Sequence, residues 1–213
     1  MFVLDKPIAK ITVNQDSQCY NKQAFSIKNS SSVVGDKIDF TQFTFGSNIY
    51  PNVDSLSPYS FNSIGKKPIK LFIQTNESCS DTSSIDVYVL ETPEAQITGD
   101  SICLYQTANI KAKQTLGSPI KIWSWDLGDG NSANIQNPKY TYKSTGNYNL
   151  RLNVTDQFGC SNSMLASNLV LVYALPIPNF TVSTSNFGIN QMNLKFKPLQ
   201  SPNYKYQWVF PDG

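Results

Sequence analysis

The sequence of 213 residues contains no histidine and a single arginine, Arg151. Histidine is the commonest general base in enzymes and the commonest metal ligand, so its absence argues against catalysis by this chain. Bidentate clamps on phosphate or carboxylate groups need arginine, and the other 16 of the 17 basic residues are lysines. We therefore expect a protein that is not an enzyme, and we predict no catalytic residues.

The chain also has little net charge and no long apolar run. Its formal charge is +2 with scattered lysines, whereas a nucleic-acid-binding surface needs clustered basic residues. The apolar segment at residues 169–172 is far too short to span a bilayer. Residues 1–6 lack the basic head and the apolar core of a signal peptide. These features predict no nucleic-acid partner and no membrane-spanning segment.

Aromatic residues are abundant, and they recur in a repeated pattern. Residues 123–130 read Trp-Ser-Trp-Asp-Leu-Gly-Asp-Gly, which is an alternating strand running into a tight turn. Residues 41–46 (Thr-Gln-Phe-Thr-Phe-Gly) and 206–213 (Tyr-Gln-Trp-Val-Phe-Pro-Asp-Gly) are divergent copies. A spacing of roughly 80 residues indicates an array of small domains rather than one large fold.

Further matches between the copies give the domain plan. Residues 7–12 match residues 93–98, and the segment after Gly65 matches the segment after Gly146. A third copy begins near Pro178 and ends soon after its aromatic strand. We predict domains at residues 1–91 and 92–175, followed by the incomplete start of a third domain at residues 176–213. Because the third copy offers few sheet partners, it would bury too little apolar surface to fold alone.

The four cysteines fall two per copy at equivalent positions. Cys19 matches Cys103, and Cys79 matches Cys160. Four cysteines allow three connectivities, and a pairing that respects the repeat is Cys19–Cys79 with Cys103–Cys160. Such bonds persist outside the reducing cytosol. Four buried free thiols are the alternative, and a metal site is disfavoured because no two cysteines lie close in sequence.

The turn signals and apolar alternation predict about seven short strands per copy. In the second copy Tyr148, Leu150, Leu152 and Val154 share one face, and polar residues alternate with them. Trp125 is expected at the centre of the sandwich, with Phe43 and Trp208 in its place in the other copies. This pattern is typical of an immunoglobulin-like β-sandwich. The fold class is therefore all-β, with tandem sandwiches in an extended array joined by short proline-bearing linkers.

These residues resemble the polycystic-kidney-disease (PKD) domain family. Its hallmark is an aromatic strand ending in Gly-Asp-Gly, then Asn-Pro and a tyrosine, then Gly-x-Tyr. Here the hallmark corresponds to residues 125–130, 137–142 and 146–148. The cysteine after the long strand, in Gly159-Cys160-Ser161, resembles the version found in surface proteins of gliding bacteria with a type IX secretion system.

The resemblance implies an extracellular or cell-surface location and a non-catalytic role. In such proteins tandem copies form the stalks of adhesins, so we expect a stalk or adhesion segment of a larger protein. Its partners would be neighbouring PKD-like domains and surface polysaccharide or protein ligands. The alternative is an accessory module of a secreted hydrolase that binds substrate or glycan.

Two groups are candidate binding sites. Asp126, Asp129 and Asn131 place oxygen atoms around the glycine-rich turn, and calcium binds such oxygen clusters. The alternative is that Asp129 accepts hydrogen bonds from the turn backbone and that no cofactor binds. Trp123 could stack on a sugar if it is exposed, or it could be buried beside Trp125.

Overall fold

The computed structural model describes residues 5–186, 192–199 and 205–209. These residues form β-strands and one short 3-10 turn, η1 (Tyr20–Lys22), and they contain no α-helix. Accordingly, the described part of the chain offers no helix with the length and hydrophobicity needed to cross a membrane. The chain divides into two units, residues 1–172 and 173–213. The predicted all-β class is confirmed.

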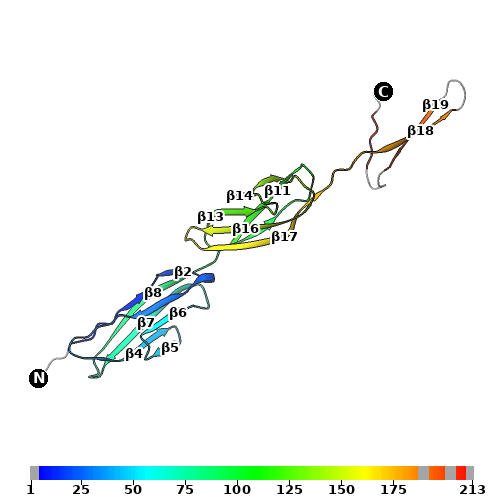
Figure 1. Ribbon diagram of the computed structural model, residues 1–213. Coiled ribbons are helices and arrows are strands. Elements are labelled where there is room, and N and C mark those ends of the chain that lie inside the picture. The colour runs from blue at the N-terminus through cyan, green and yellow to red at the C-terminus, as the bar shows by residue number, and fades with distance from the viewer. Residues whose placement is uncertain (1–4, 187–191, 200–204, 210–213) are drawn as a thin grey trace. The chain divides into compact units, whose positions relative to one another are not determined.

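The first unit contains two five-stranded sheets with the same strand order (Figure 1). In the first sheet the order is β2-β8-β7-β4-β5, with β2 (Ser17–Cys19), β4 (Ile38–Phe45), β5 (Asn48–Pro51), β7 (Gly65–Thr75) and β8 (Ser80–Leu90). In the second sheet the order is β10-β17-β16-β13-β14, with β10 (Ile102–Cys103), β13 (Ile120–Asp126), β14 (Ser132–Ala133), β16 (Gly146–Asp156) and β17 (Ser161–Tyr173). Each strand of one sheet has its counterpart in the other, as the repeated sequence predicts.

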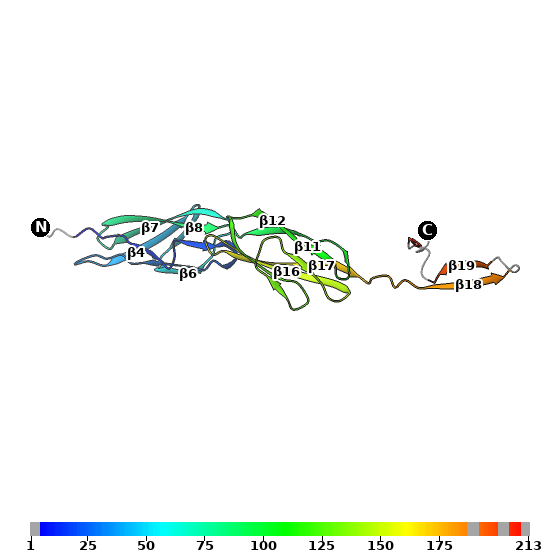
Figure 2. The same cartoon turned by 90° about the horizontal axis from the view of Figure 1, so that it is seen from above.

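Smaller sheets face the two large ones, as Figure 2 shows from a second direction. In the first half these strands are β1 (Ile11–Val13), β3 (Phe25–Asn29) and β6 (Ser55–Tyr59), in the order β1-β3-β6. In the second half β9 (Glu94–Thr98) pairs with β12 (Lys111–Leu116), and β11 (Thr107–Asn109) pairs with β15 (Lys139–Thr141). The facing sheets enclose two separate hydrophobic cores, so the predicted β-sandwich is confirmed.

The long strands bury one face because their apolar residues alternate with polar ones. On β7, Ile69, Leu71 and Ile73 have no exposed surface, and they pack with Phe25 and Ile27 of β3. On β16, Leu150, Leu152 and Val154 are buried in the second core, while Tyr148 is half-buried. The inward row predicted for β16 is therefore confirmed.

Aromatic side chains occupy the centre of each core. Trp125 of β13 is 1% exposed, and its Nε1 donates a hydrogen bond to the Ile135 carbonyl at 2.9 Å. Phe43 of β4 is fully buried at the equivalent place in the first core. Burying a side chain of this size provides about 2–3 kcal/mol of stabilisation, so these rings are major contributors to each sandwich.

The second unit is a hairpin of β18 (Phe180–Asn186) and β19 (Met192–Pro198), with Phe180 opposite Pro198. Trp208 was predicted at the centre of a sandwich, but it is 39% exposed. The Trp208 and Phe180 rings make an edge contact, with their centroids 5.2 Å apart. Among the described residues of this unit, no second sheet covers that ring. Residues 187–188 and 210–213 of the predicted third copy lie outside the described residues. The boundaries at residues 91/92 and 175/176 stay predictions.

Candidate functional site

The glycine-rich turn after β13 closes on its own backbone. Asp126 Oδ1 accepts a hydrogen bond from the Gly128 N–H at 2.9 Å, and Asp129 Oδ1 accepts one from the Asn131 N–H at 3.1 Å. The two glycines have positive φ angles of 81° and 87°. A Cβ at Gly128 would collide with the carbonyl oxygen of Asn149, whereas a Cβ at Gly130 would meet open space. The first glycine is therefore required for space and conformation, and the second for conformation alone.

Asp129 also ties this turn to the neighbouring strand β15. Its Oδ2 accepts a hydrogen bond from the Tyr140 hydroxyl at 2.8 Å. Partial burial acts to raise the pKa of Asp129, but the hydrogen bonds from Tyr140 and Asn131 outweigh it and hold the pKa below its ordinary value. The same bond raises the pKa of the Tyr140 hydroxyl. The carboxylate is thus held ionised by donors within the domain.

The predicted calcium ligands therefore have partners in the turn itself. The Asp126 and Asp129 carboxylates both accept backbone hydrogen bonds, and the Asn131 N–H is one of the donors. Across the residues that the structure describes, no group of three or more His, Cys, Asp or Glu side chains could hold a metal ion. Calcium binding at Asp126, Asp129 and Asn131 stays a prediction, and a calorimetric titration with calcium is its test.

The remaining motif residues form hydrogen bonds with backbone groups. The Tyr142 hydroxyl donates to the Leu127 carbonyl at 3.0 Å inside the core, and burial raises the pKa of this hydroxyl. The Asn137 side chain accepts a hydrogen bond from the Ala112 N–H at 3.0 Å. The Tyr148 hydroxyl donates to the Ser144 carbonyl at 2.8 Å, in the manner of a tyrosine corner. These residues serve the fold rather than a reaction.

Trp123 lies two residues before Trp125 on β13 and is half-buried against the second core. Part of its ring is therefore committed to packing. The sugar-stacking role of Trp123 stays a prediction.

The cysteines do not pair as the repeat predicts. The structure contains one disulfide, between Cys19 and Cys160, with the two Cα atoms 5.5 Å apart. Cys79 and Cys103, both within the described residues, are free thiols. The predicted bonds Cys19–Cys79 and Cys103–Cys160 are wrong: the bond that forms joins the first sandwich to the second.

The reason lies in the length of the strands between the predicted partners. Cys19 is aligned with Leu90 at the end of β8, whereas Cys79 immediately precedes the first residue of that strand. An 11-residue strand spans about 35 Å, so the two cysteines lie at opposite ends of the first sandwich. Likewise β17, with 13 residues, begins directly after Cys160. The informative signal in the sequence was the position of Cys79 and Cys160 in tight turns, far from the start of each copy.

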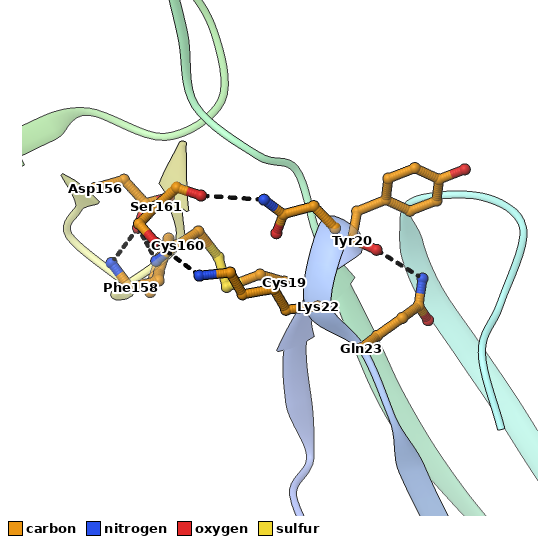
Figure 3. The surroundings of a disulfide bond; sticks show 9 residues. Cys19, Tyr20, Lys22, Gln23, Asp156, Phe158, Cys160 and Ser161 are labelled. Carbon is orange, nitrogen blue, oxygen red and sulfur yellow. Dashed lines mark hydrogen bonds between the residues drawn. A yellow bond between two sulfur atoms is a disulfide. The ribbon is translucent and has the colours of Figure 1, made fainter. Parts of the chain in front are cut away.

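Hydrogen bonds accompany the disulfide (Figure 3). The Asn21 side-chain amide donates to the Ser161 carbonyl at 3.1 Å, and Lys22 Nζ lies 3.4 Å from Ser161 Oγ. Asp156 shapes the turn that presents Cys160, because its Oδ1 accepts from the N–H groups of Phe158 and Cys160 at 2.8 and 2.9 Å. The junction thus combines one covalent bond with two polar contacts on the same turn.

Sequence reasoning missed an aromatic hollow on the first sandwich, of about 510 Å³. Phe45, Tyr59 and Phe61 line it, and the Tyr59 and Phe61 rings meet edge-on at 4.9 Å. Burial, together with a hydrogen bond to Tyr50, raises the pKa of Tyr59 to about 12. Further lining comes from polar residues, namely Asn48, Ser60, Asn62 and Lys67. The alternation of Tyr59 and Phe61 beside a polar loop was the signal for this site.

Residues 90–171 match the model of the PKD domain. Collagenase ColA of Clostridium perfringens is 33% identical over 117 residues, an alignment that covers 54% of this chain and 10% of that protein. The chain thus spans about a tenth of the length of this relative. The resemblance of the second copy to PKD domains is confirmed.

Several solved structures are similar to this chain at low identity. Fibronectin(III)-like modules of Clostridium thermocellum CbhA are 12% identical with a TM-score of 0.33, covering 78% of this chain and 95% of theirs. Immunoglobulin domains 1–5 of Sidekick-1 are 7% identical with a TM-score of 0.42, covering 92% and 46%. A Ca2+-stabilized ice-binding adhesin of an Antarctic bacterium is 10% identical with a TM-score of 0.46, covering 85% and 52%. Identities and scores this low carry no argument about function.

Proposed function

We propose that this chain is a non-catalytic stalk or adhesion segment of an extracellular multi-domain protein. In this proposal PKD-type sandwiches in series carry mechanical load and hold binding domains at a distance. The observation that carries it is the Cys19–Cys160 disulfide, which connects two sandwiches that each have a hydrophobic core of their own. A bond between cores adds nothing to the interior of either one, so its natural role is to limit movement between them.

The disulfide also supports the location. Disulfides form and persist in oxidising compartments, which include the cell exterior. A surface protein of a gliding bacterium with type IX secretion is the specific setting that we propose, on the strength of the Gly159-Cys160-Ser161 resemblance. Surface polysaccharides or proteins are the proposed ligands of the complete molecule.

Small-angle X-ray scattering of the oxidised chain tests the stalk. We expect an elongated particle. When Cys19→Ser removes the bond between the sandwiches, we expect the link between them to become more flexible. Cys79→Ser is the matched control, because it removes a free thiol and should leave the scattering unchanged. A compact profile for the oxidised chain would contradict the stalk.

A second function is favoured by the aromatic hollow of the first sandwich. Sugar rings stack on aromatic faces while their hydroxyls bond to amides and hydroxyls, and the hollow supplies both through Tyr59, Phe61 and Asn62. The similarity of residues in this chain to a collagenase also supports an accessory role beside a secreted hydrolase. In this second proposal the segment binds substrate, either polysaccharide or protein, for a catalytic domain elsewhere.

Retention on insoluble polysaccharides and on collagen fibrils tests this second function. Phe61→Ala should abolish retention if the hollow binds, whereas Trp123→Ala should abolish it if the predicted platform on β13 binds. Tyr105→Ala is the control, because Tyr105 is 66% exposed and lies in neither site. Equal retention of all variants and the unmodified chain would exclude both sites.

A further inference from the structure

The two free cysteines are the structural counterparts of the two bonded ones. Cys103 ends β10, which lies beside β17 at the same edge of the second sheet that β2 occupies in the first. Cys19 ends β2 in the same way, and both cysteines are half-buried after a buried residue, Gln18 or Ile102. The strand that presents Cys19 to the second sandwich therefore has a counterpart that presents Cys103 at the far end of that sandwich.

The turns that carry Cys79 and Cys160 are equally alike. In the first, Thr75 N–H donates to the Cys79 carbonyl at 2.8 Å, and in the second Asp156 N–H donates to the Cys160 carbonyl at 2.9 Å. In each turn the residue before the cysteine has a positive φ, 69° at Ser78 and 85° at Gly159.

A side chain stabilises both turns in the same manner. Thr75 Oγ1 accepts a hydrogen bond from the Cys79 N–H at 3.2 Å, as Asp156 Oδ1 does from the Cys160 N–H. A serine follows each cysteine, and Ser161 is the residue that Asn21 and Lys22 contact at the junction. Ser80 offers the same groups beside Cys79. Each sandwich thus has a strand-end cysteine at one end and a turn cysteine at the other.

We propose that Cys103 and Cys79 each form a disulfide with a neighbouring domain, in the same way that Cys19 and Cys160 join the two sandwiches. Cys103 forms a disulfide with the turn cysteine of a PKD-type domain that follows the second sandwich. Cys79 forms a disulfide with the strand-end cysteine of a PKD-type domain that precedes the first sandwich. The proposal rests on the proposed function, an array of joined sandwiches, and names the contact by which such an array continues. Within this rule a domain that carries both cysteines is covalently bonded to both neighbours and contains no internal disulfide.

Formation of each bond is a two-electron oxidation. Two thiols lose two protons and two electrons and join through their sulfur atoms, while a disulfide oxidant such as oxidised glutathione accepts them and becomes two thiols. The thiols at Cys79 and Cys103 are partly accessible, so they can meet both the oxidant and a partner cysteine. The array is then linked as its domains fold.

The test inserts a second copy of residues 92–175 between residues 175 and 176 of the full chain. The inserted copy carries Ser101→Ala and Ser163→Ala, both at exposed positions, so that its Cys103 peptide and its Cys160 peptide each differ in mass from those of the first copy. After oxidation with glutathione and alkylation of remaining thiols, the disulfide-linked peptides are identified by mass spectrometry. The probe for Cys103 is thus the turn cysteine of the inserted copy.

We expect two bonds: Cys19 with the first Cys160, and Cys103 with Cys160 of the inserted copy. Cys103→Ser in the first copy should remove the second bond and leave the bond between Cys19 and the first Cys160 intact. Alkylated Cys103 in the first copy, or a bond within the inserted copy, would each overturn the proposal. The bond between Cys19 and the first Cys160 serves as an internal reference. If this bond is missing, the joined array of the proposed function fails. If it is present while the first Cys103 is free, the present proposal fails alone.

Discussion

At the scale of single residues, the most demanding positions serve the turn after β13. Gly128 faces the Asn149 carbonyl oxygen so closely that no side chain fits, whereas Gly130 has no atom within 4 Å of where a Cβ would be. The two glycines of one short motif therefore meet different physical requirements. The sequence shows two equivalent glycines, and only the packing of β16 against the turn distinguishes them.

Alanine at these positions should destabilise the second sandwich unequally. Gly130→Ala should cost about 1 kcal/mol, because a Cβ disfavours the left-handed backbone conformation. Gly128→Ala adds a collision with backbone and should cost about 2–4 kcal/mol. Urea denaturation followed by tryptophan fluorescence measures both. Equal losses in the two variants would show that the Asn149 contact is relieved by a small shift of the turn.

Asp81 should make the first sandwich sensitive to acid. The Ala9 N–H, at 2.9 Å, and the Lys6 ammonium, at 2.8 Å, lower the pKa of Asp81 from 3.8 to about 2. Because the folded-state pKa is the lower one, the stabilisation is complete above pH 3.8 and is lost as the pH falls through 2.

Denaturant unfolding at pH 7, 3 and 2 checks this expectation. The unmodified chain should lose stability over that range, and Asp81→Asn should show a weaker dependence on pH. Lys6→Gln should retain most of the dependence, because the Ala9 bond is the larger cause of the shift. An unchanged pH profile for Asp81→Asn would assign the acid sensitivity to other carboxylates.

At the scale of elements, alternation in the sequence identified the strands well. The buried row of β16 and the central Trp125 were both predicted from spacing and residue type. The partner of each cysteine was not predicted, because β8 and β17 keep the two cysteines of each copy at opposite ends of their sandwich. The aromatic hollow was also missed, since it needs β4, β5 and the loop after β6 to be placed together.

The two cysteine-bearing turns permit a reciprocal exchange. Ser78 adopts a conformation that glycine prefers, and Gly159 adopts it in the equivalent turn. Ser78→Gly should therefore stabilise the chain by about 0.5 kcal/mol, and Gly159→Ser should destabilise it by about 1 kcal/mol. Thermal unfolding of both variants under oxidising conditions compares them. Changes of the same sign would mean that the two turns are not equivalent in energy.

At the scale of the whole molecule, the repeat predicted separate sandwiches, and the first unit contains two separate hydrophobic cores. Repetition alone cannot tell a bond within one copy from a bond between copies, because both satisfy the same spacing. The length of the strands decides the matter in favour of a junction bond. The chain-entropy model gives roughly 5 kcal/mol for a loop of 141 residues, an upper figure here since neither core depends on the bond.

Loss of the junction bond should therefore loosen the link without unfolding either sandwich. Cys19→Ser should keep Trp125 buried, with unchanged fluorescence, while proteolysis at residues 91–93 becomes faster. Cys103→Ser should alter neither property of the isolated chain. Unfolding of either core in Cys19→Ser would show that the bond stabilises a sandwich directly.

Peptide mapping of the oxidised, alkylated 213-residue chain decides whether the disulfide joins two sandwiches. We expect one linked pair of peptides, containing Cys19 and Cys160, with Cys79 and Cys103 alkylated. Linked peptides that pair Cys19 with Cys79 and Cys103 with Cys160 would contradict this expectation.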